Sequence, residues 1–100
     1  MKPTTKQRAA ELLSVALKLA ARDGWHSLTH DSVAAAAGVS PSLVKVRLGT
    51  AATMRKAVMR MAVRLRCYTV VAQGLAVRDR TARKADHMLR IEASDWVRRA

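Results

Sequence analysis

The sequence predicts an all-α domain with three short helices, a longer fourth helix and a helical tail. Half of the 100 residues are hydrophobic, yet only Trp25, Tyr68 and Trp96 are aromatic. The apolar residues are mainly Ala, Leu, Val and Met, a composition more typical of helices than of sheets. The few glycines and prolines fall where elements are expected to begin or end. This length is typical of a single domain with a modest core.

The first helix is expected to begin after Thr4, which fits a capping box with Gln7. Apolar residues then recur at helical spacing, namely Ala9, Leu12, Leu13, Ala16, Leu19 and Ala20. Gly24 suits the left-handed position that follows a helix. Trp25 is expected to fold back as an anchor in the core.

Two short helices joined by a tight turn are expected next. Thr29 suits the N-cap of the first, between Leu28 and Val33, which occupy the two positions of a hydrophobic staple. Gly38 is expected to end that helix after about two turns.

The second of these helices is expected over residues 40–48. Ser40 suits its N-cap and Pro41 its first helical position. Two capped helix starts separated by a glycine define a helix-turn-helix.

A fourth helix is expected from Thr50 to about Gln73, with Gly74 breaking it. Its apolar face would carry Met54, Val58, Met61, Leu65 and Tyr68, with Lys56, Arg60 and Arg64 roughly opposite. One or two helices are expected after it, along an apolar stripe of Ala82, Ala85, Leu89, Ala93 and Trp96. Residues 1–73 are therefore interpreted as the helix-turn-helix domain, and residues 74–100 as a helical tail and candidate dimerisation element.

The charge balance favours a polyanionic partner. The chain holds 19 Lys and Arg against seven Asp and Glu, a net charge of +12. No acidic residue lies between Ser32 and Arg78, although this span is rich in Lys and Arg. Such one-sided charge points most simply to nucleic acid, and the alternative is a solubilising surface.

The segment from Gly24 to Val58 resembles the DNA-binding domain of the TetR family of bacterial repressors. The family shows a glycine after its first helix, a threonine about five residues later, and a block similar to I-A-x-x-A-G-V-S. Here these are Gly24, Thr29 and residues 33–40, within a match that covers roughly residues 6–65. The resemblance implies a helix-turn-helix whose second helix, residues 40–48, enters the major groove.

The chain departs from the family in three places. Lys45 stands where the family usually has a tyrosine, and Leu48 stands where it has a phenylalanine. The third departure is the short segment after Leu65, which is too short to enclose a sizeable inducer pocket, so sensing of a small-molecule inducer is not expected. A short protein that carries this kind of DNA-binding domain alone resembles proteins of phages and mobile elements.

The candidate DNA-binding residues come from three places in the chain. Residues near the start of the 40–48 helix would contact bases or phosphates. Thr29 and His30 would bind a phosphate at the N-terminus of their helix. Basic residues near the N-terminus of the chain would contact the adjacent DNA backbone. Capping alone is the alternative role for Thr29 and Ser40, and solvation alone is the alternative for the basic residues. The full set is Lys2, Lys6, Arg8, Thr29, His30, Ser40, Pro41, Ser42, Lys45 and Arg47.

Other chemistry is not indicated. His26 and His30 lack the glutamate of a metalloprotease pattern, and neither a nucleophile elbow nor a glycine-rich phosphate loop is present. Cys67 stands alone, so it has no partner for an internal disulfide. We expect no enzyme activity, no cofactor and no metal site.

A homodimer is expected, because one helix-turn-helix offers few contacts and pairing supplies a second half-site. Its expected seam consists of Met61, Leu65, Tyr68, Leu89 and Trp96, with a core position as the alternative for Trp96. The leading hypothesis is a cytoplasmic, nucleoid-associated transcriptional regulator, most simply a repressor, that binds specific sites in double-stranded DNA. The alternatives are a non-specific nucleoid-type protein and a basic adaptor for an acidic host protein. The capped helices argue against a membrane-surface peptide.

Overall fold

The structure, a computed structural model, describes residues 4–99, and every regular element in this range is helical. This confirms the expected all-α class. The elements are α1 (Thr5–Asp23), the short 3₁₀ helix η1 (Trp25–Ser27), α2 (His30–Ala37), α3 (Pro41–Leu48), α4 (Ala51–Arg64), α5 (Tyr68–Ala76), α6 (Arg80–Arg83) and α7 (His87–Arg99).

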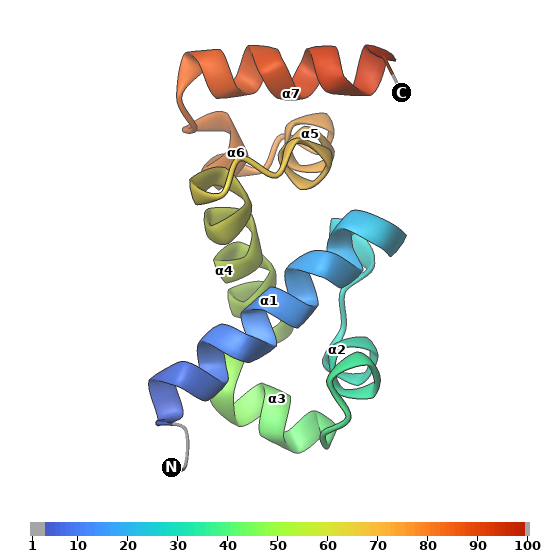
Figure 1. Cartoon of the computed structure of the whole chain (residues 1–100), viewed down its shortest axis with the longest axis vertical. Helices are drawn as coiled ribbons and strands as arrows, with labels where there is room; N and C mark the ends of the chain where they lie inside the picture. The colour runs from blue at the N-terminus through green and yellow to red at the C-terminus, as the bar shows by residue number, and fades with distance from the viewer. Residues whose placement is uncertain (1–3, 100) are drawn as a thin grey trace.

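The helices form two groups that α4 joins (Figure 1). In the first group α1 packs against α2, α3 and α4, and in the second α5 packs against α4, α6 and α7. The molecule is elongated, with principal extents of 41 × 23 × 21 Å. α3 and α7 lie toward opposite ends of the long axis, so the helix-turn-helix is separated from the tail (Figure 1).

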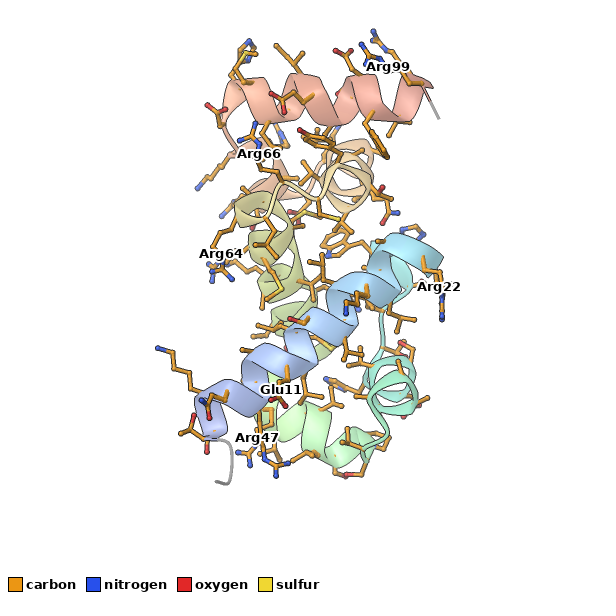
Figure 2. All side chains as sticks on the ribbon, viewed as in Figure 1. Glu11, Arg22, Arg47, Arg64, Arg66 and Arg99 are labelled. Atoms are coloured by element: carbon orange, nitrogen blue, oxygen red, sulfur yellow. The ribbon has the colours of Figure 1, made fainter. Side chains whose placement is uncertain are left out.

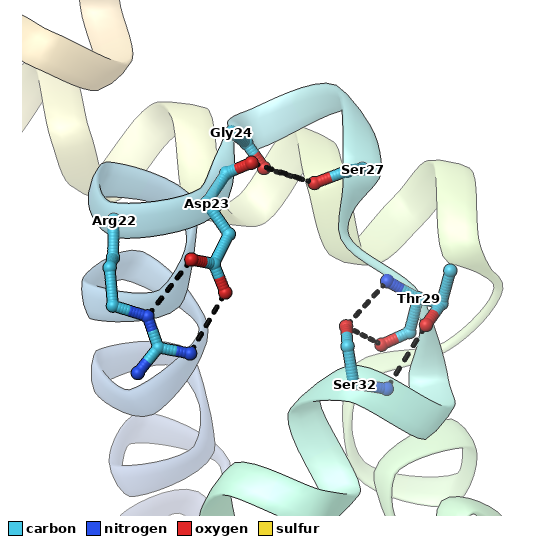
Figure 3. Close-up of polar contacts among 6 residues, drawn as sticks. All are labelled: Arg22, Asp23, Gly24, Ser27, Thr29 and Ser32. Carbon is cyan, nitrogen blue, oxygen red and sulfur yellow. Dashed lines mark hydrogen bonds and ion pairs between the residues drawn. The ribbon is translucent and has the colours of Figure 1, made fainter.

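The expected helix starts are present and are made by local hydrogen bonds. Thr4 and Gln7 form the capping box, with the Thr4 N–H donating to Gln7 Oε1 over 2.7 Å. Thr29 and Ser32 form a second one, in which each backbone N–H donates to the other side chain over 3.0 Å (Figure 3). Ser40 and Thr50 cap α3 and α4 by a single bond each, in which the side-chain oxygen accepts the N–H of Leu43 and of Thr53. These four starts confirm the sequence-based prediction.

Trp25 connects the two groups of helices. Its side chain is buried, its indole N–H donates to the Arg55 carbonyl of α4 over 2.9 Å, and its backbone N–H donates to Gln73 Oε1 of α5 over 2.6 Å. This confirms the expectation that Trp25 is an anchor in the core. Gly24 before it has φ +112° and ψ +132°, so the expected left-handed helical conformation is wrong there, although φ is positive.

The fourth helix is shorter than expected: α4 ends at Arg64 rather than near Gln73. Arg66 adopts φ +56°, and the Cys67 N–H donates to the Ala62 carbonyl over 2.8 Å. This is a Schellman motif, which normally has glycine at the left-handed position. The prediction failed because the chain has an arginine at that position and the apolar pattern continues through the turn.

Gly74 lies inside α5 and does not break a helix, which corrects a second expectation. It is buried where α5 crosses α4 and α6. A Cβ built on Gly74 overlaps the methyl of Met59 and lies 2.8 Å from the Cβ of Ala82. The residue is therefore small because two neighbouring helices approach it closely. The predicted domain boundary between residues 73 and 74 accordingly falls within this helix.

A polar and aromatic cluster holds α7 against α5. The Tyr68 hydroxyl donates to Glu92 Oε2 over 2.6 Å, and Arg66 donates to the same oxygen over 3.0 Å. These two donors, the tyrosine first, hold the pKa of the Glu92 carboxyl below its usual range. Trp96 stacks at a tilt on Tyr68, with ring centroids 6.0 Å apart, and its indole donates to Thr69 Oγ1 over 3.2 Å.

The residues of the expected dimer seam divide into two groups. Met61 and Leu89 are only 8% and 1% exposed within one chain, so a second chain cannot reach them in this fold. Leu65 and Trp96 are 60% and 51% exposed and remain accessible, whereas Tyr68 is half-buried. The apolar stripe of the tail packs α7 against α5 of the same chain. Trp96 lies at the edge of this contact.

Candidate nucleic-acid interface

Helix α3 has one buried side and one exposed side. Val44 and Leu48 are buried, the first completely and the second 7% exposed. Ser42, Lys45 and Val46 are exposed. Residues three and four positions apart share a helix face, so these three side chains lie together on the outward face. This arrangement leaves α3 with a side that can enter a groove of a duplex.

The turn before α3 fixes how that helix is held. Gly38 adopts the left-handed conformation, with φ +71° and ψ +33°, and the Val39 N–H donates to the Ala34 carbonyl over 3.0 Å. A glycine tolerates this conformation without a steric cost from a Cβ. Val33 of α2 and Val44 of α3 are both fully buried in the same core cluster. The outward face of α3 is therefore presented by a closely packed scaffold.

Most of the predicted contact residues of α2 and α3 come together around one shallow depression. This depression has a volume of about 340 Å³, and we call it the α2–α3 hollow. Its lining includes Thr29, His30, Asp31, Pro41, Ser42 and Lys45. The starts of two helices, whose N–H groups and dipoles attract anions, thus border the same depression as the Lys45 ammonium.

Two residues of the α2–α3 hollow have additional roles. His30 Nε2 lies 2.8 Å from the Gly49 carbonyl, and because a carbonyl only accepts, this nitrogen is the donor. The bond ties the start of α2 to the end of α3. Asp31 also lines the hollow, although sequence reasoning did not consider it, and its carboxylate opposes a phosphate there. Lys45 is the cation of this hollow.

Arg47 does not join Lys45, although both were predicted to contact DNA. It lines a separate cleft of about 140 Å³ between α1 and α3, together with Arg8 and Glu11. Figure 2 shows Glu11 next to Arg47. Arg47 is half-buried, and its Nε has no hydrogen-bond partner among residues 4–99. Two positions separate Arg47 from Lys45, so the helix turns it by about 200° toward α1.

The remaining predicted contacts lie around this end of the molecule. Lys6 and Arg8 are exposed on the first turn of α1, and Ser40 is exposed at the start of α3. Ser40 accepts the Leu43 N–H over 3.2 Å, so its capping role is present whatever else it contacts. Lys2 lies outside the residues that the structure describes.

Val46 is the residue that sequence reasoning missed. It is 74% exposed, the most exposed large hydrophobic side chain in the described chain, and lies beside Lys45. An apolar side chain on a groove-facing helix can contact the methyl group of thymine. Its position four residues after Ser42 is the sequence pattern that could have identified it.

Residues 4–99 hold neither a helix suited to span a membrane nor a cluster of metal ligands. No helix there combines the length and apolar character needed to cross a bilayer. No three His, Cys, Asp or Glu side chains in that range gather as metal ligands. Comparisons with protein-family models, curated proteins and solved structures found no match to this chain.

Proposed function

We propose that this protein binds double-stranded DNA in a sequence-dependent manner, with α3 in the major groove, and regulates transcription as a repressor. The observation that carries the proposal is the outward face of α3, where Ser42, Lys45 and Val46 are exposed together. These side chains supply a hydroxyl, a cation and an apolar group, which are three kinds of contact that distinguish base edges in that groove.

The proposal includes a helix-turn-helix of the TetR type. The left-handed Gly38, the capped start of α3 and the buried Leu48 support it, because they fit the turn, the N-terminus and the apolar plug of such a motif. Lys45 takes the place of the family's tyrosine and would act on phosphate or on guanine as a point charge.

A homodimer completes the proposal. One α3 presents few side chains to bases, so binding at a short site needs a second copy on a two-fold-related half-site. Leu65 and Trp96 are the exposed members of the expected seam. Both belong to the end of the molecule remote from α3, which would leave the two DNA-contacting faces free.

The first experiment is selection of bound duplexes from a random pool at physiological salt. A repressor of this kind enriches a two-fold symmetric consensus whose half-site spacing reports the dimer. Equal recovery of unrelated duplexes would instead favour a non-specific nucleoid-type protein, which the net charge of +12 also supports. Failure to retain any duplex would refute both.

The second experiment measures the affinity of Lys45→Ala for the selected duplex. Loss of one base-edge contact costs about 1–3 kcal/mol, which is roughly a 5- to 150-fold loss of affinity. Because Lys45 is exposed, the melting temperature should stay close to that of the parent. Lys18→Ala is the matched control, since it removes the same charge from an exposed position of α1. Equal affinity for Lys45→Ala and the parent would refute the placement of α3 in the groove.

A further inference from the structure

A second concentration of positive charge lies away from α3, between α4 and α6. Lys56 and Arg60 of α4 face Arg80 of α6 and Lys84, which follows α6 directly, across a depression of about 420 Å³. We call this depression the basic hollow. All four side chains are exposed at its rim, and its lining contains no carboxylate. Val63, Thr81 and Ala85 complete that lining.

The four cations have no ion-pair partner among residues 4–99. The nearest acids along the chain are used elsewhere, because Asp79 accepts the Ala82 N–H over 3.0 Å and Asp86 accepts the Leu89 N–H over 3.3 Å. These two carboxylates cap α6 and the start of α7, and they do not line the basic hollow.

The arrangement opposes stability when the hollow is empty. Lys56 and Arg60 are four residues apart, as are Arg80 and Lys84, and like charges at this spacing on a helix repel. A concave surface lined by one sign of charge also focuses the electrostatic field and concentrates counter-ions. An anion bound between the two pairs would remove this repulsion.

The support beneath the hollow is closely packed. Ala82 of α6 is fully buried against Gly74 of α5, which in turn contacts the buried Met59 of α4. The side-chain stems therefore start from fixed positions, and only their charged ends need to adjust to a ligand. The volume also falls within the range typical of small-molecule sites.

We infer that the basic hollow binds a compact polyphosphate, such as a triphosphate group, at a site distinct from the α3 face. Two features favour a compact ligand over the duplex backbone. The hollow is concave, and Figure 1 shows α3 and α6 at opposite ends of α4. A duplex seated on α3 would therefore lie near the start of that helix, whereas Arg60, Arg80 and Lys84 lie toward its end.

The test is calorimetric titration of the whole chain with inorganic triphosphate in the absence of DNA. One saturable site is expected, with an affinity that weakens as salt is added. In Arg60→Ala/Lys84→Ala, which removes one cation from each side, the affinity should fall about tenfold or more. The same ligand should raise the melting temperature of the parent but not of this variant.

The matched control is Lys18→Ala/Arg98→Ala, which makes the same change in net charge at exposed positions of α1 and α7. It should bind triphosphate like the parent. Equal loss in both double variants would overturn the inference, because it would trace binding to overall charge. Absence of a saturable site in the parent would overturn it too.

Duplex binding separates this inference from the proposed function. Arg60→Ala/Lys84→Ala should keep the duplex affinity of the control variant, and Lys45→Ala should keep the triphosphate affinity of the parent. If triphosphate does not bind while Arg60→Ala/Lys84→Ala loses duplex affinity relative to the control, the hollow holds DNA backbone and the compact-ligand inference is wrong.

Discussion

Replacing Gly74 with alanine tests the close contact of α5 with α4 and α6. The added methyl would overlap Met59 and lie 2.8 Å from the Cβ of Ala82. Met59 is a flexible side chain, but it is fully buried and has little room to move. The Ala82 Cβ is attached directly to α6, so that helix must shift to accept the change.

Two opposing contributions set the size of the effect. Alanine is favoured over glycine in a helix interior by about 1 kcal/mol. Adding a methyl to a filled core costs about 1–3 kcal/mol, and the approach to a fixed Cβ places Gly74→Ala in the upper part of that range. We therefore expect a net loss of about 1–2 kcal/mol in the free energy of unfolding.

Thermal and urea unfolding followed by circular dichroism measure this loss. For a domain of this size, each kcal/mol corresponds to a fall of roughly 4–8 °C in melting temperature. The double variant Gly74→Ala/Ala82→Gly should be compared with the two single variants, because it moves the methyl group from α6 to α5. If the overlap is the cause, the two substitutions destabilise less together than their separate effects add up to.

A rise in melting temperature for Gly74→Ala would refute this reasoning. It would mean that helix propensity outweighs packing and that α5 and α6 do not approach each other this closely. A shift of α6 would also displace Arg80 and Lys84, so Gly74→Ala should weaken triphosphate binding at the basic hollow.

Three further predictions concern the tail and the turns. Tyr68→Phe removes the main donor that lowers the Glu92 pKa. A carboxyl with a lowered folded-state pKa adds stability above its unfolded pKa, and that stability is lost as pH falls through the folded value. The gain in melting temperature from acid to neutral pH should therefore be smaller in Tyr68→Phe than in the parent, and identical pH profiles would contradict this. Arg78→Gly should raise the free energy of unfolding, measured in urea, by about 0.5–1 kcal/mol. Arg78 has φ +58°, and glycine avoids the left-handed penalty of about 1–2 kcal/mol. Part of this gain is offset because glycine also adds conformational freedom to the unfolded chain. Leu65→Glu should weaken self-association in sedimentation experiments with little change in the stability of the single chain, since Leu65 is 60% exposed, and unchanged association would remove it from the seam.

The helix starts could be predicted because the determining contacts are local. Thr4, Thr29, Ser40 and Thr50 each accept a backbone N–H from the residue three positions later. Such a bond depends on a short sequence and hardly at all on the rest of the fold.

Two helix ends could not be predicted, because they depend on arginines in a conformation that normally favours glycine. Arg66 and Arg78 both have positive φ. Packing of α5 onto α4, and of α6 onto α4 and α5, outweighs the local preference there. The apolar periodicity of residues 54–68 runs through the first of these turns, so the pattern indicated a single helix.

The candidate DNA-binding face was predicted in part. The helical period placed Ser42 and Lys45 on one side of α3, and both are exposed. The exposure of Val46 and the rotation of Arg47 toward α1 depend on which side of α3 the core covers. That choice is made by tertiary contacts of α3 with α1 and α2, which its own eight residues do not specify.

The sequence by itself determined the all-helical class, the caps and the two short helices joined at Gly38, because these follow from composition, apolar period and hydrogen bonds between residues three apart. Only the tertiary structure decided where α4 ends, why position 74 is a glycine, and which cations gather between α4 and α6. Those features arise where separate helices pack on one another, and neither the close approach of two helices nor the repulsion between cations on different helices can be read from a single short segment.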